Sequence, residues 1–181
     1  MWRTMRLALL ALMLLPLSLR ADDSTVDFDA DVAFSSFRTF AIKDGKIDST
    51  RPEVNNSIVI NALKKTIRDE LTVRGLKETP DKPDVVIQYI VEATEYSVGS
   101  GGRANPIGPA RGGRGGRGDP TGTPVDFIEG TLVIDVSTSQ PALLVWRGVY
   151  RDDEKNSAKF AQKLAGDAKK LLAQYPPKKK S

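Results

Sequence analysis

The chain contains 181 residues, with no cysteine and no histidine, and with 27 lysines and arginines against 23 aspartates and glutamates. These absences exclude disulfide bonds, a cysteine nucleophile, a lipid on an N-terminal cysteine, and the usual roles of histidine in acid–base catalysis and metal binding. The length suits one domain with a hydrophobic core of its own.

The positive net charge of +4 is concentrated in three short segments. Three arginines lie within the first 21 residues, and seven further basic residues are Arg103, Arg111, Arg114, Arg117, Lys178, Lys179 and Lys180. The remaining body has 17 basic and 23 acidic side chains. The sequence therefore does not describe a basic domain built to bind polyanions.

Residues 1–21 have the pattern of a secretory signal peptide. Arg3 and Arg6 form its positive start, residues 7–19 are an apolar run, and Ala21 supplies a small residue for cleavage. The run is shorter than the roughly 20 apolar residues that a membrane-spanning helix needs. The sequence predicts export, cleavage near Asp22, no transmembrane anchor afterwards, and a periplasmic or outer-membrane-associated location.

The first half of the mature chain predicts two short strands and a helix. Residues 25–28 and 38–43 are β-like, with phenylalanines that offer apolar anchors. Residues 50–74 are typical of a helix, with Thr50 and Glu53 at capping-box spacing and Gly75 as its stop. The apolar stripe of this helix is Ile60, Leu63, Ile67 and Leu71.

Three further strands are predicted, and a mobile loop separates the first of them from the other two. Residues 85–94 alternate between one apolar and one mixed face, whereas residues 127–137 and 142–150 are β-rich and joined by a short hairpin link. Between them, residues 98–123 are rich in glycine, arginine and proline and have no apolar period. The Arg-Gly repeats of this loop resemble a nucleic-acid-binding segment. The loop lacks interleaved aromatic residues, however, and an exported protein seldom meets nucleic acid, so no nucleic-acid partner is expected.

The sequence also predicts the positions and contacts of individual hairpin residues. We expect Trp146 in the core, Gly130 at a bulge or a close backbone approach, and Arg147 beside Asp135 across the hairpin. These assignments explain the hairpin residues by packing and pairing rather than by chemistry.

The C-terminal part of the chain predicts a second helix. Asp152, Asp153 and Glu154 are expected at its N-terminus, where negative charge is favoured, and the Pro176-Pro177 pair is expected to end it. Its apolar stripe is Phe160, Leu164, Ala168, Leu171 and Tyr175. The element order predicts a single α+β domain over residues 22–175, with an antiparallel or mixed sheet of about five strands and two helices on one face, followed by a basic tail at 176–181.

No motif in the sequence has the structural context that its known chemistry requires. Gly113, Gly115 and Gly118 fit the dinucleotide-binding spacing, but a strand rather than a helix follows them. No phosphate-binding loop, nucleophile elbow or serine–lysine dyad is present. We therefore expect no catalytic residues, no cofactor and no metal.

Six short motifs resemble a known family when they are taken together in this order. They are Val26-Asp27-Phe28, Phe34-Ser35-Ser36-Phe37-Arg38-Thr39-Phe40, Arg74-Gly75-Leu76, Pro83-Asp84-Val85, the segment EGTLVIDV at 129–136, and LVWRG at 144–148. The chain resembles the bacterial envelope family called domain of unknown function 4136. Many members are lipoproteins, and this chain departs from them because it has no cysteine. The resemblance implies an exported envelope protein with a small α+β domain, and it carries no catalytic residue over.

We expect a non-catalytic envelope protein whose seven basic loop and tail residues contact an anionic envelope surface or an unidentified envelope protein. The alternative is an assembly or scaffold module that binds other envelope proteins through a strand edge or sheet face. A carboxylate-dependent hydrolase is the third hypothesis, and neither histidine, cysteine nor a nucleophile motif supports it.

Overall fold

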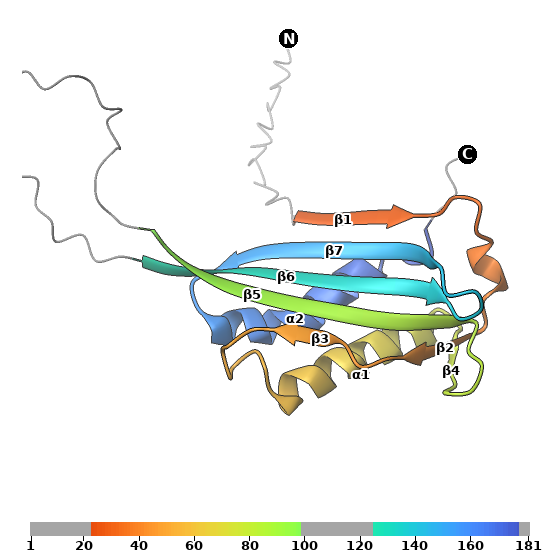
Figure 1. The fold of residues 1–181 in the computed structure, drawn as a ribbon, viewed down its shortest axis with the longest axis horizontal. Helices are drawn as coiled ribbons and strands as arrows, with labels where there is room; N and C mark the ends of the chain where they lie inside the picture. The colour runs from red at the N-terminus through yellow and green to blue at the C-terminus, as the bar shows by residue number, and fades with distance from the viewer. Residues whose placement is uncertain (1–22, 99–124, 178–181) are drawn as a thin grey trace, which may run out of the picture.

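A computed structural model describes residues 23–98 and 125–177. Figure 1 draws the other residues as a thin grey trace. The predicted signal peptide, the predicted loop beyond Val98, and the seven basic residues singled out above all lie outside the described ranges.

The described residues form one mixed sheet of seven strands in the order β1-β7-β6-β5-β2-β4, with β3 also beside β5. The strands are β1 (Asp23–Phe28), β2 (Thr39–Ile42), β3 (Lys46–Asp48), β4 (Lys77–Glu78), β5 (Val85–Val98), β6 (Val125–Thr138) and β7 (Leu144–Glu154). The α+β class is confirmed, but the sheet has more strands than the predicted five. The two additional strands, β3 and β4, have only three and two residues, too few to show a periodic pattern.

The centre of the sheet is the antiparallel set β5, β6 and β7, which confirms the predicted pairing of the two hairpin strands β6 and β7. On the far side of β5, the strands β2 and β3 pair with it in parallel. The predicted contact across the β6–β7 hairpin is present, because Asp135 stands opposite Arg147 in the register. The irregularity in this ladder lies between Val136 and Ser137 rather than at Gly130.

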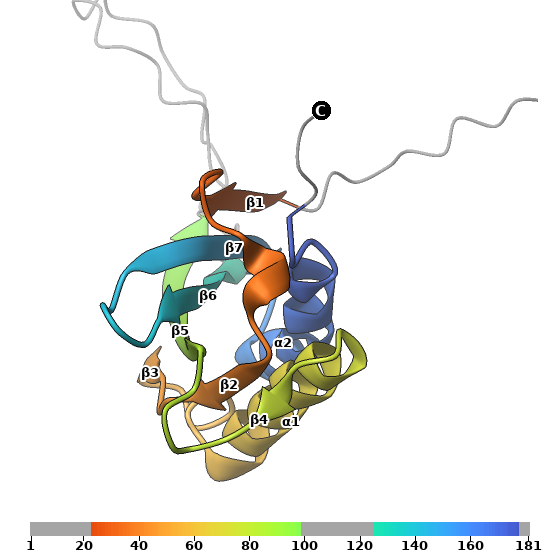
Figure 2. The ribbon, with the colours of Figure 1, turned by 90° about the vertical axis from the view of Figure 1, so that its right-hand side faces the viewer.

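Two helices, α1 (Ser57–Val73) and α2 (Ser157–Leu172), lie side by side on one face of the sheet (Figure 2). Most of the predicted stripe residues are buried: Leu63, Ile67 and Leu71 in α1, and Phe160, Leu164, Ala168 and Leu171 in α2. Of the other two, Ile60 is only half-buried and Tyr175 lies beyond the end of α2. Trp146 of β7 is fully buried beneath them, which confirms its place in the core. The core of the described chain therefore lies between this face of the sheet and the two helices.

The predicted start of α1 was wrong, because the helix begins at Ser57 and not at Thr50. The Asn56 side chain accepts a hydrogen bond from the Val59 amide and donates to the carbonyls of Pro52 and Glu53. Val54 is buried in the preceding turn. This asparagine cap takes the place of the predicted Thr50–Glu53 box. The predicted stop is confirmed, since Gly75 has a φ of 88°.

The predicted start of α2 was also wrong. Asp152, Asp153 and Glu154 belong to β7, and Asn156 caps the helix by accepting from the Lys159 amide. The helix ends at Leu172, before the proline pair, and Tyr175 beyond it packs edge-on against Trp146.

Motifs that carry the family resemblance meet in space and hold the fold together. The Asp84 carboxylate accepts hydrogen bonds from the amides of Arg38 and Thr39 and from the Thr39 hydroxyl, at 2.8 to 3.0 Å. These bonds keep the pKa of Asp84 below its ordinary value. The Arg74 side chain likewise donates to the Tyr175 carbonyl and to Glu70. These motif residues therefore join β2 to β5 and α1 to the segment after α2.

Gly130 is a point of close approach between α2 and the sheet, as predicted. A Cβ at this position would stand 2.0 Å from the Phe160 ring. Phe160 is only 1% exposed, so its ring is enclosed by other core residues. Only a residue without a side chain fits beneath this ring.

We predict that Gly130→Ala lowers the free energy of unfolding by about 2 to 3 kcal/mol, the usual cost of overpacking a core. Gly166→Ala is the matched control, because nothing lies within 4 Å of its added Cβ inside α2. That control should stabilise the protein by about 0.5 to 1 kcal/mol, through helix propensity. Urea unfolding of both variants tests this prediction, and a Gly130→Ala variant as stable as the wild type would contradict it.

Candidate functional site

The face of the sheet opposite the helices is left uncovered by the described residues (Figure 2). We call it the open face. It comprises Asp23, Thr25 and Asp27 of β1; Lys46 and Asp48 of β3; Val86, Gln88, Ile90, Glu92 and Thr94 of β5; Glu129, Thr131, Val133 and Asp135 of β6; and Arg147, Val149, Arg151 and Asp153 of β7.

An aliphatic row crosses the middle of the open face. Ile90, Val133 and Val149 stand opposite one another on β5, β6 and β7, and all three side chains are half-buried. No helix of the described chain reaches them. β-Branched side chains in adjacent strands pack together and shield one another only in part. Within residues 23–98 and 125–177, the row is an apolar strip that remains accessible to a partner.

A charged row lies on one side of this strip. The Arg147 guanidinium makes two hydrogen bonds of 2.7 Å to the Asp135 carboxylate, which confirms the predicted contact. The bonds to Asp135 raise the pKa of Arg147. The Asp135 side chain is 14% exposed, whereas that of Arg147 is 46% exposed. This fork–fork pair fixes the direction of both side chains on the open face.

The other side of the strip is acidic. Glu129 stands between Thr94 and Asp153 in the register, and Glu92 lies one row closer to the strip. Partial burial and the negative charges of Asp153 and Glu129 raise the pKa of Tyr96. The open face as a whole carries seven acidic and three basic side chains, a net charge of −4.

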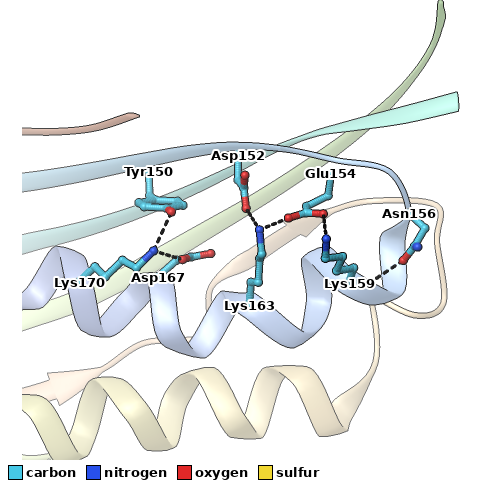
Figure 3. A network of polar contacts seen from close by, with 8 residues as sticks. All are labelled: Tyr150, Asp152, Glu154, Asn156, Lys159, Lys163, Asp167 and Lys170. Atoms are coloured by element: carbon cyan, nitrogen blue, oxygen red, sulfur yellow. Dashed lines mark hydrogen bonds and ion pairs between the residues drawn. The ribbon is translucent and has the colours of Figure 1, made fainter. Parts of the chain in front are cut away.

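A second group of charges lies on the helix side, between β7 and α2 (Figure 3). Glu154 is 4% exposed and forms ion pairs with Lys163 and with Lys159. The same Lys163 ammonium is 2.9 Å from the Asp152 carboxylate. These contacts attach the first half of α2 to the end of β7.

One turn further along α2, Asp167 is 3% exposed and leaves its Oδ2 atom without a hydrogen bond. Burial raises the pKa of Asp167, against the opposing effect of Lys170 at 3.4 Å. The Lys170 ammonium also lies 3.0 Å from the Tyr150 hydroxyl. Figure 3 shows these side chains enclosed between the helix and the strand, so we assign this group to the attachment of α2.

Among the described residues, one surface hollow lies away from the open face and another borders it. One, of about 400 Å³, runs between the helices and is lined mainly by apolar residues, among them Val59, Ala62 and Ala161. The other, of about 490 Å³, lies beside β5 where β3 ends, and its lining includes Asp48, Glu92 and Glu95. Sequence reasoning missed both, because each depends on the distance between two elements rather than on a local pattern.

Neither a metal nor a membrane span is indicated by the described ranges. In residues 23–98 and 125–177, no group of three or more acidic side chains is placed to hold a metal ion. No helix in the same ranges is both long and apolar enough to cross a bilayer.

The fold defines a two-layer α+β domain, with one open sheet and one helical layer. Within that class, the chain belongs to the family described as "Domain of unknown function (DUF4136)", whose sequence profile matches residues 24–177. This confirms the resemblance carried by the six motifs.

Solved structures that share the fold include the following two. A DUF4136 family protein from Bacteroides thetaiotaomicron superposes with a TM-score of 0.53 and 14% identity, over 85% of this chain and 95% of that one. A PDZ domain protein from Parabacteroides distasonis superposes with a TM-score of 0.57 and 18% identity, over 88% of this chain. This chain spans only 36% of the length of that second protein. No curated protein matches the sequence.

The buried Asp167 generates a pH prediction. Its pKa is raised in the folded state, so between the unfolded value of about 4 and the folded value the native state holds more protons. Stability therefore falls as the pH rises through this window. Asp167→Asn removes the ionisation, and the stability of this variant relative to the wild type should increase between pH 3 and pH 7.

Urea unfolding at both pH values measures this difference. The matched control is Asp81→Asn, which alters an exposed aspartate and should show the same relative stability at the two pH values. An Asp167→Asn variant whose relative stability is unchanged, or lower at pH 7, would contradict the prediction.

Proposed function

We propose that the protein is a non-catalytic binding module of the bacterial cell envelope that binds a basic partner protein through its open face. The observation that carries the proposal is the uncovered aliphatic row of Ile90, Val133 and Val149, set within a surface of net charge −4. Apolar strips bordered by charge are typical of protein interaction surfaces. The negative border favours a partner of opposite charge.

The predicted signal peptide and the family support an envelope location. Among the alternatives stated above, the proposal corresponds to the module that binds through a sheet face. Contact between the basic loop or tail and an anionic surface is a separate hypothesis, because those residues lie outside the described ranges. It stays a prediction, and the open face does not depend on it.

The arrangement of the carboxylates favours binding over hydrolysis. A carboxylate pair that performs acid–base catalysis needs one member kept protonated by an apolar environment. Three carboxylates line the hollow beside β5, and all three are exposed. Two of them are engaged in ion pairs, Asp48 with Lys46 and Glu95 with Arg51. These groups are suited to attract cations rather than to donate a proton.

We predict that the double variant Glu92→Gln/Glu129→Gln captures about five-fold less basic protein from a salt extract of the envelope than the wild type does. Two exposed ion pairs across an interface contribute together about 1 kcal/mol, which corresponds to that factor. The loss should shrink at high salt, where exposed charges are screened.

The matched control is Asp31→Asn/Asp81→Asn, which removes two exposed carboxylates away from the open face. It should capture as much as the wild type. Equal capture by all three proteins, or an equal loss in both double variants, would contradict the proposed function.

A further inference from the structure

In the part of the chain that the structure describes, the strand β5 carries a free edge at its far end. Its 14 residues pair with β6 along their whole length, and on the other side β2 and β3 pair only with residues up to Glu92. Figure 1 shows β5 continuing past the end of β3. Among the strands that the described residues form, none lies beside β5 beyond Glu92. Unpaired strand edges are templates for the addition of another strand.

The backbone groups that face this edge can be identified. The Ile87 carbonyl accepts from the Lys43 amide at 2.9 Å, so the backbone groups of Ile87 point toward the β2–β3 side. Successive residues of a strand direct these groups to alternate sides, and the ladder with β6 has no shift over this length. Glu95 therefore directs its N–H and C=O to the free edge. It is the first residue with this orientation that lies wholly beyond β3.

The free edge borders the hollow of about 490 Å³ described above. Asp48 and Glu92 line the hollow together with Glu95, and Arg51 pairs with the Glu95 carboxylate. Neither hollow described above is lined by residues of β1, and β4 offers only two residues. The β5 edge thus combines backbone groups that no described strand pairs with, space beside them and negative charge.

We infer that an extended cationic segment of the partner adds to the sheet beside Glu95, as a further strand that continues the row begun by β3. This inference rests on the proposed function and specifies how the partner binds. Main-chain hydrogen bonds to Glu95 supply affinity, and alternate side chains supply selectivity. In the added strand, lysines or arginines at every second position face Asp48 and Glu92 on the open face. The small apolar residues between them lie on the other face, beside Ala93.

The test uses the full chain and a labelled probe peptide of alternating lysine and valine, eight residues long. We expect this peptide to bind and to slow hydrogen exchange at the Glu95 amide about ten-fold or more, measured by NMR. A peptide with glutamate in place of lysine should not bind. A version N-methylated at every residue, which has no N–H group to donate from either edge, should bind at least ten-fold more weakly.

The matched variants are Glu95→Pro and Glu95→Ala. Both lose the pair with Arg51, but only proline removes the outward N–H, and strand edges tolerate proline. Glu95→Pro should weaken peptide binding at least ten-fold, and Glu95→Ala by no more than about three-fold. If Glu95→Pro does not fold, the affinity of the N-methylated peptide for the wild type tests the inference instead.

Three results would overturn the inference: no binding of the lysine–valine peptide, binding without protection of the Glu95 amide, or equal affinity for the N-methylated peptide. Failure of the proposed function is a separate outcome. If Glu95→Pro still captures envelope protein while Glu92→Gln/Glu129→Gln does not, the open face binds without strand addition. If both capture as the wild type does, the proposed function fails as well.

Discussion

The contact between the Phe160 ring and the bare backbone at Gly130 sets the distance between α2 and the sheet. A second glycine, Gly148, makes room in the same way for Trp146 and Leu171. The helix lies close to the sheet at these two positions, and large side chains of β6 and β7 are buried in the layer between them. The largest side chains of β6 and β7 lie on the helix-covered face, and the open face carries mainly polar, charged and β-branched side chains.

The charged side chains on the two faces of the sheet also differ in their surroundings. On the helix side, the buried Glu154 and Asp167 are matched by lysines of α2, and their contacts are internal. On the open face, most carboxylates are exposed, and the most enclosed pair, Asp135 with Arg147, is held rigid by two hydrogen bonds. Rigid charge beside an accessible aliphatic row reduces the entropy that a partner must overcome on binding. The open face is therefore the part of the domain best suited to recognition.

The sequence was informative wherever a pattern extended over several residues. The alternation in β5 and in the β6–β7 hairpin, and the stripes of both helices, predicted those elements and the buried position of Trp146. The predicted helix starts were wrong because each helix has more than one possible cap in its sequence. Asn56 competes as a cap with Thr50, and Asn156 competes with the acidic run at 152–154. Tertiary contacts, such as the burial of Val54, decide which cap is used. Strands β3 and β4 exist only because β5 and β2 lie beside them.

Only part of the candidate site could be predicted from the sequence. The mixed face of residues 86–94 indicated one side of β5 with polar character, but not which side the helices would cover. The free edge at Glu95 depends on where β3 leaves the sheet, and no local pattern encodes that point. The residues first proposed for electrostatic contact, from Arg103 to Lys180, stay predictions.

The most direct test of the account is site-specific photo-crosslinking in the cell that produces the protein. A photoreactive side chain at Gln88 lies on the open face, and one at Lys65 lies on the exposed side of α1. The account predicts a discrete cross-linked protein from position 88 and none from position 65. Cross-linking from position 65 alone would place the interaction on the helical layer and contradict the central claim.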